Sequence, residues 1–178
     1  SDCYYNIADF SKSADLDNEY LSLSLSSATN FVQYNLGYAY FQQRDFKKAK
    51  NSFRKFIKLA KDSMRLNDAY LRTSDCYFML SDFRMAAKNY ETASKYALFD
   101  TDYASYNRSV CLGLIGKSSG KVKLLKQLEE KYDAMGQDLS SYLDDLLQTD
   151  YLTYWDYVHL DTLLSLQNPR TNLPDEQI

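Results

Sequence analysis

The chain has 178 residues, of which 45% are hydrophobic and 25% charged, and its formal net charge is −3 at pH 7. A chain of this length can bury a core without disulfides and fits one domain or one short repeat array. Its total charge gives no argument for nucleic acid or a membrane surface, and no run approaches the ~20 apolar residues of a membrane span. Its three cysteines cannot all pair internally, which argues against a disulfide framework and leaves the compartment open.

The first 29 residues are expected to hold a half-repeat helix and an insertion. Residues 3–16 carry Ile7, Phe10 and Leu16 on one helical face, as the second helix of a repeat would without its first. This start favours an array that begins upstream. In residues 21–26 Leu and Ser alternate, which is a strand pattern, but an isolated strand is unstable. We therefore expect a helical or irregular insertion there.

Residues 30–63 have the pattern of two short helices folded back on each other. Leu36, Gly37 and Tyr40 share one face of a first helix, and Arg44-Asp45 is a polar break. The second helix has an apolar stripe at i, i+3, i+4, i+7 spacing: Phe46, Ala49, Phe53, Phe56 and Ile57. The pattern predicts helices at 30–43 and 46–61, with Phe53 packed within the pair and against the next one.

The same pattern recurs at residues 67–100 and, more weakly, at 102–135, which predicts helix pairs 68–80/83–97 and 103–116/119–132. The packing positions are Tyr70, Tyr77, Phe83, Ala86, Tyr90 and Ala93, then Leu112, Gly116, Leu125 and Leu128. Ala39, Cys76 and Cys111 share one repeat position. A small apolar residue there lets two helices approach, and buried cysteine acts as a small hydrophobe, so we expect a structural role for both cysteines.

From Leu139 a last apolar stripe is followed by a tail. The stripe contains Tyr142, Leu143, Leu146, Leu147, Tyr151, Tyr154, Trp155 and Val158, and its other side bears Asp144, Asp145 and Asp156. A terminal repeat that differs from the others is typical of a capping element. We predict a capping helix or degenerate repeat over 136–167 and a frayed tail over 168–178.

The placing L-G-x-x-Y followed by F-x-x-A-x-x-x-F resembles the tetratricopeptide repeat, a helix–turn–helix unit with a period near 34 residues. The resemblance implies an all-α fold, a right-handed α-solenoid of antiparallel helix pairs, with three repeats at 30–63, 67–100 and 102–135. It also implies non-catalytic binding of a protein or peptide. More narrowly, YNLGYAYF, SDCYFML and LGLIGKSS followed by KVKLLKQLEEKY are similar to long, exported multi-repeat proteins of Bacteroidota. That would imply the cell envelope or periplasm; without it the expected location is cytoplasmic.

Candidate catalytic and metal motifs fail on their own requirements. Gly116-Lys117-Ser118 ends like a phosphate-binding P-loop, but that motif needs a glycine where Cys111 stands and a preceding strand. His159 is the only histidine, and zinc requires three or four well-placed ligands. A hydrolytic triad would need a Ser or Cys beside this histidine in space, and a single sequence does not exclude that arrangement. We predict no catalytic, cofactor or metal site, and hence no enzyme.

An aromatic stripe is the main functional lead. Repeat geometry implies that one face of each first helix lines a concave groove, and 17 tyrosines supply contact area with a hydrogen-bonding tip. The predicted partner-binding groove consists of Phe31, Tyr34, Tyr38, Phe41, Leu71, Arg72, Asp75, Phe78, Tyr103, Tyr106 and Val110. The alternative is that neighbouring helices or residues 21–26 cover the stripe. Exposure of Tyr34 and Tyr38 separates the two interpretations.

Charge is distributed unevenly. Residues 44–65 carry nine Lys/Arg and two Asp, a net +7, whereas residues 133–178 carry nine Asp/Glu and one Arg, a net −8. A basic stripe on the outer helix face (Lys47, Lys50, Arg54, Lys58 and Lys61) is either a solvated surface or a docking site for an anionic partner.

The expected partner is a protein or peptide of unknown identity, not nucleic acid. Self-association through the acidic face of another copy is a further hypothesis. The alternative function is a structural repeat segment of a larger cell-envelope assembly protein, with the groove packed on neighbouring repeats or another copy.

Overall fold

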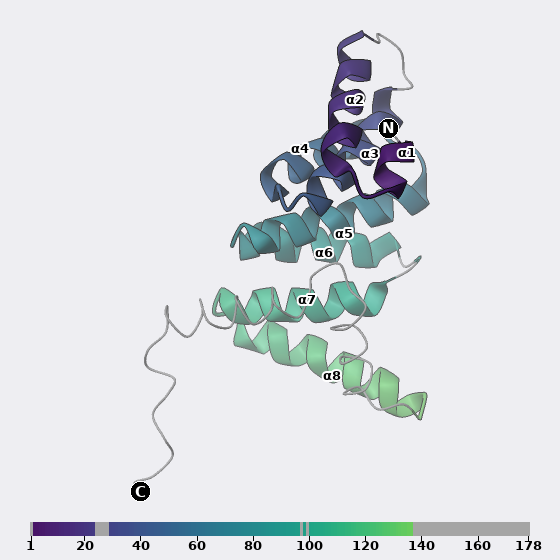
Figure 1. The fold of residues 1–178 in the computed structure, drawn as a ribbon. Helices are drawn as coiled ribbons and strands as arrows, with labels where there is room; N and C mark the ends of the chain where they lie inside the picture. The colour runs from purple at the N-terminus through teal and green to yellow at the C-terminus, as the bar shows by residue number, and fades with distance from the viewer. Residues whose placement is uncertain (1, 24–28, 97, 99, 137–178) are drawn as a thin grey trace, which may run out of the picture. The chain divides into compact units, whose positions relative to one another are not determined.

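The computed structural model describes residues 2–23, 29–96, 98 and 100–136, and all regular structure in this part is helical (Figure 1). Its eight helices are α1 (Asp2–Asn6), α2 (Phe10–Leu23), α3 (Thr29–Gln42), α4 (Phe46–Leu59), α5 (Ser63–Met79), α6 (Phe83–Tyr96), α7 (Thr101–Leu114) and α8 (Ser118–Ala134). The predicted all-α solenoid of antiparallel helix pairs is confirmed.

The chain divides into two compact units, residues 1–131 and 132–178. Within the first, each helix from α1 to α6 packs against the next helix along the chain. α7 and α8 run antiparallel: near one end Lys131 pairs with Asp102 (Nζ–Oδ2 2.6 Å), and near the other Gly120 faces Leu112. In the second unit, the described residues are the end of α8 and the two residues that follow it. Among the described helices, none has the length and hydrophobicity that crossing a bilayer requires.

One turn geometry joins the two helices of every pair. Ala8, Arg44, Ser81 and Gly116 all have positive φ, between 59° and 76°, at spacings of 36, 37 and 35 residues. In each turn the N–H of this residue donates to the carbonyl three positions back, and the next N–H donates to the carbonyl five back, at 2.8–3.0 Å. This is the Schellman pattern, which satisfies the last carbonyls of a helix. The backbone therefore repeats even where the side chains differ.

An aspartate follows the left-handed residue in three of these turns and caps the next helix. The side chains of Asp9, Asp45 and Asp82 accept a hydrogen bond from the backbone N–H three residues on, at 3.2, 3.0 and 3.2 Å. Such a side-chain oxygen satisfies one of the free N–H groups at a helix start, worth about 1 kcal/mol. Lys117 stands at this position in the fourth turn, where a side chain without an acceptor gives no cap.

The N-terminal segment differs from the prediction of one helical face over residues 3–16. The turn at Ala8 splits it into α1 and α2, so Ile7 and Leu16 are 71% and 39% exposed, while Ser13 and Ala14 are buried. The prediction was wrong because it read one continuous helical period through a turn that contains no Gly or Pro. α1 and α2 are therefore joined by the same kind of turn as the later helix pairs. Residues 21–23 belong to α2, and residues 24–28 lie outside the described residues.

The core lies between successive helices. One buried cluster combines Phe41, Ala49, Phe53, Phe56, Ala69 and Cys76. Phe53 has no exposed surface, in agreement with the prediction, and neither do Ala39, Cys76 and Cys111, so the shared small position is confirmed as a close-packed one. The predicted capping helix and tail, with His159, Asp144, Asp145 and Asp156, lie beyond the last described residue, Gly136.

Candidate functional site

A ladder of aromatic rings runs along α3. The ring centroids of Phe31 and Tyr34 are 6.2 Å apart in a stacked arrangement, and those of Tyr34 and Tyr38 are 5.2 Å apart, edge to face. Phe31 is 45% exposed and lies beneath the guanidinium of Arg65. Tyr34 and Tyr38 are half-buried because their inner sides pack on Phe53. Spacings of three and four residues place all three on one helix face.

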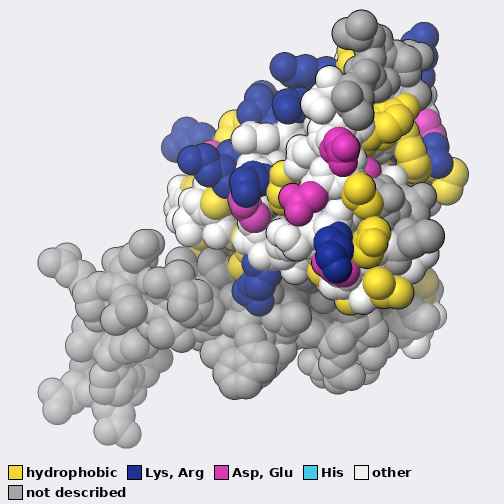
Figure 2. Space-filling view, turned by 45° about the horizontal axis from the view of Figure 1, so that its top comes forward, with side chains coloured by type: hydrophobic (Ala, Val, Ile, Leu, Met, Phe, Trp, Pro, Cys, Tyr) yellow, Lys and Arg dark blue, Asp and Glu magenta, His cyan; other side chains and the backbone are white. Residues whose placement is uncertain are grey.

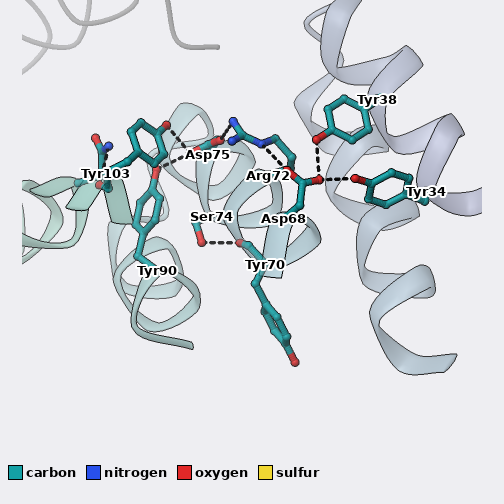
Figure 3. Close-up of polar contacts among 10 residues, drawn as sticks. Tyr34, Tyr38, Asp68, Tyr70, Arg72, Ser74, Asp75, Tyr90 and Tyr103 are labelled. Carbon is teal, nitrogen blue, oxygen red and sulfur yellow. Dashed lines mark hydrogen bonds and ion pairs between the residues drawn. The ribbon is translucent and has the colours of Figure 1, made fainter. Parts of the chain in front are cut away.

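Both tyrosine hydroxyls are held by one carboxylate of the neighbouring helix. Tyr34 and Tyr38 donate to Oδ2 of Asp68 on α5, at 2.6 and 2.5 Å (Figure 3). Burial raises the pKa of both tyrosines, and the negative charge of Asp68 raises it further. Both phenols therefore stay protonated donors at neutral pH, and the hydrogen bonds fix the orientation of the two rings.

Asp68 begins a buried charged network along α5. Arg72 Nε approaches Asp68 Oδ1 at 3.4 Å, and Arg72 Nη1 donates to Asp75 Oδ2 at 2.7 Å. The other Asp75 oxygen accepts from the hydroxyls of Tyr90 on α6 (2.6 Å) and Tyr103 on α7 (2.8 Å). Figure 3 shows α5 between these partners, with Tyr34 and Tyr38 of α3 on one side and Tyr90 and Tyr103 on the other. One network thus connects four helices.

Burial governs the electrostatics of the network. Arg72 and Asp75 are 1% and 0% exposed. Desolvation raises the pKa of the Asp75 carboxyl, although Arg72 and the two tyrosine hydroxyls act in the opposite direction. For Arg72, burial alone would lower the pKa, but Asp75 and the other groups around it outweigh burial and raise it. The guanidinium therefore remains charged. Each buried charge has a partner, as the low-dielectric interior requires.

A pocket of about 290 Å³ adjoins the aromatic ladder. It is lined by Tyr5 and Asn6 of α1, Ser13 of α2, and Asn35 and Tyr38 of α3. All five side chains are neutral, and each carries a hydroxyl or an amide. The described lining residues can therefore hydrogen-bond to neutral polar groups such as peptide N–H and C=O, and none of them offers a counter-charge to an ionic ligand.

The structure divides the predicted groove residues into two groups. Five keep solvent exposure: Phe31, Tyr34, Tyr38, Tyr106 and Val110. Six are buried: Phe41, Leu71, Arg72, Asp75, Phe78 and Tyr103. These six do not line an open surface, because neighbouring helices cover them; Phe41, for example, belongs to the core cluster with Phe53. The ladder thus belongs to the core on its inner side and to the surface on its outer side. The two sequence-based interpretations, a binding groove and a covered stripe, therefore do not exclude each other.

The predicted basic stripe lies mainly at the surface. Lys47, Arg54, Lys58 and Lys61 are exposed, whereas Lys50 is half-buried with its ammonium 5.0 Å from the centre of the Tyr77 ring. Figure 2 shows Lys and Arg side chains gathered on the upper left flank of the molecule.

Sequence reasoning missed two members of the network, Asp68 and the hydroxyl of Tyr90, and the whole lining of the pocket except Tyr38. Asp68, Arg72 and Asp75 follow one another at i, i+4 and i+7, which places them on one helix face. In the preceding repeat the position equivalent to Asp75 is occupied by Tyr38. A carboxylate at a packing position, with Arg three residues before it, was the available signal.

The described residues contain no group of three or more His, Cys, Asp or Glu side chains arranged to hold a metal ion. Cys76 and Cys111 are buried free thiols. Burial raises the pKa of the Cys111 thiol to about 12, and raises that of Cys76 as well. The thiolate is the reactive form of cysteine, and a raised pKa disfavours it. Both cysteines are therefore unreactive packing residues.

Comparison with known families matches residues 31–63 to the tetratricopeptide repeat. These residues include α3 except for its first two residues, the turn at Arg44 and the whole of α4. A search of curated proteins finds no match. The matched segment contains the aromatic ladder, and the helix pairs on either side share its turn geometry. The helical repeat chain is thus similar to a class of protein-interaction scaffolds.

Proposed function

We propose that this chain is a non-catalytic scaffold that binds an extended protein segment across the α3 face, with Phe31, Tyr34 and Tyr38 as apolar anchors and the adjoining pocket as the polar subsite. The single observation that carries the proposal is the continuity of the two: Tyr38 ends the ladder and also lines the pocket. An apolar ridge beside neutral donors and acceptors suits a polypeptide, whose side chains and backbone groups alternate along its length.

Preorganisation supports the same conclusion. Tyr34 and Tyr38 are held by packing on Phe53 and by hydrogen bonds to Asp68. Binding to rings that are already fixed loses little side-chain entropy, which is one of the main costs of association. The burial of six other predicted residues narrows the proposed surface to α3 and its contacts with α1 and α2.

The test is selection of binding peptides from a random library with the full-length chain, followed by fluorescence anisotropy with single variants. Phe31→Ala and Asn35→Ala should each weaken the selected peptides at least about tenfold, or about 1.4 kcal/mol. Asn51→Ala, on the exposed face of α4, is the matched control and should bind like wild type. Circular dichroism should show unchanged helicity in all three.

Two results would overturn the proposal. In one, the selected peptides bind Phe31→Ala and Asn35→Ala as tightly as wild type. In the other, Asn51→Ala weakens them equally, which would place the binding surface on α4.

A further inference from the structure

The exposed cations of α4 form a continuous face with little internal compensation. Lys47, Arg54, Lys55 and Lys58 are exposed, and Lys61 follows the helix. From Lys47 to Lys58 the face is about 17 Å long, at ~1.5 Å per residue. Among the described residues, α4 takes part in an ion pair between Lys48 and Asp45, at 3.0 Å, which includes none of these five cations.

An apolar contact site lies beside this basic face. A pocket of about 300 Å³ lies at its C-terminal half, lined by Lys55, Lys58 and Leu59 of α4, Asn30 and Gln33 of α3, and Leu21 of α2. Leu59 is 70% exposed. Two ammonium groups beside the exposed Leu59 and the half-buried Leu21 suit a segment in which carboxylates alternate with large apolar residues. Charge attracts such a segment over a distance, and apolar contact holds it once bound.

The chain itself contains a segment of this composition. Residues 138–161 carry six Asp and no Lys or Arg, together with Trp155 and four tyrosines. We propose that this acidic segment of one copy docks on the basic face of a second copy, that is, on Lys47, Arg54, Lys55, Lys58 and Lys61. Charge complementarity selects this occupant. The contact joins unlike surfaces, so two copies can exchange segments reciprocally or extend into a chain.

The test uses sedimentation velocity of the full-length chain over a range of concentrations. At about 0.02 M salt the average mass should rise with concentration. At about 0.5 M salt the association should be at least about tenfold weaker, because the screening length falls to a few ångströms and only the apolar contact remains. Arg54→Glu/Lys55→Glu/Lys58→Glu should weaken association at least about tenfold at low salt, since it turns attraction into repulsion.

A matched control separates the face from net charge. Lys117→Glu/Lys123→Glu/Lys126→Glu makes the same change in charge with three exposed lysines at or near α8. This variant should associate like wild type. If it loses association equally, the effect is one of total charge, and the proposal fails.

Charge exchange tests the occupant. Asp144→Lys/Asp145→Lys/Asp156→Lys should also remove self-association, yet this variant should form mixed complexes with the α4 triple variant, because Lys segments then meet Glu faces. A wild-type chain that stays monomeric at every concentration at low salt would overturn the proposal. Binding of the segment to α4 of its own copy would give this result too. A failure of the two variants to associate on mixing would overturn it as well.

Discussion

Gly37 lies where α3 approaches α4, and its substitution by alanine tests how tightly the repeat is packed. A Cβ added at Gly37 would lie 2.6, 2.7 and 2.9 Å from three carbons of the Phe53 ring. These separations are far below ordinary contact, so either the ring or the helix must move. Phe53 is fully buried, and its ring meets Tyr38 at 5.2 Å and Tyr34 at 6.1 Å. The ring therefore has little room to withdraw.

Two opposing effects set the magnitude. Replacing glycine by alanine within a helix contributes up to about 1 kcal/mol in favour of folding. Overpacking a well-filled core costs about 1–3 kcal/mol, and contact with three ring atoms favours the upper end. Gly37→Ala should therefore lower the free energy of unfolding by about 2 kcal/mol. For a chain of this size that corresponds to a fall in melting temperature of about 4–8 °C.

The assay is urea and thermal unfolding followed by circular dichroism, with Gly113→Ala as the control. At Gly113 the nearest obstacle is Cδ of Lys121, at 3.0 Å, and the Lys121 side chain is exposed and flexible. Gly113→Ala should thus be neutral or stabilising by up to about 1 kcal/mol. In a Phe53→Leu background, Gly37→Ala should cost at least about 1 kcal/mol less than in wild type. Equal stability of Gly37→Ala and wild type would refute the reasoning.

Three further predictions concern the buried polar groups. Asp75→Asn should cost about 3–5 kcal/mol of unfolding free energy because it removes the closest anionic partner of the buried Arg72 guanidinium, and Arg72→Met/Asp75→Leu should cost less than this single change in the same urea titration. The folded-state pKa of Tyr34 and Tyr38 is raised, so their contribution to stability is complete below the unfolded pKa of ~10 and falls above it. The free energy of unfolding of Tyr34→Phe/Tyr38→Phe should therefore fall less than that of wild type between about pH 9 and 11. The Cys111 thiol, with its raised pKa, should resist alkylation at about pH 8 and react in urea, as mass-spectrometric peptide mapping can show; modification of the native chain would contradict the burial.

The fold could be predicted because its main determinants are local and periodic. The stripe from Phe46 to Ile57 specified α4, and the shared small position at Ala39, Cys76 and Cys111 fixed the alignment of the pairs. The turn at Ala8 could not be predicted, because its left-handed residue is neither Gly nor Asn and carries no composition signal. The available clues were the repeat spacing of 36 residues to Arg44 and the aspartate that follows the left-handed residue in both turns.

The site was predicted less completely because exposure depends on neighbouring helices. The period of α3 placed Phe31, Tyr34 and Tyr38 on one face, and they do form a ladder. The same period on α5 does not by itself show that Arg72 and Asp75 are buried, since charged residues are usually at the surface. Their burial requires hydroxyl groups from α6 and α7, which lie 15 and 28 residues further along the chain.

The network on α5 also bears on whether the repeats are interchangeable modules. In many solenoids neighbouring units share equivalent interfaces, so units can be duplicated or reordered with small loss. Here Asp68 needs hydroxyl groups from the preceding pair, and Asp75 needs one from its own pair and one from the following pair. Moving the α5–α6 unit elsewhere would leave buried charges beside apolar neighbours, at a cost of several kcal/mol. The polar interior thereby gives this array a fixed order, and protein engineers should treat α3 to α7 as one indivisible block.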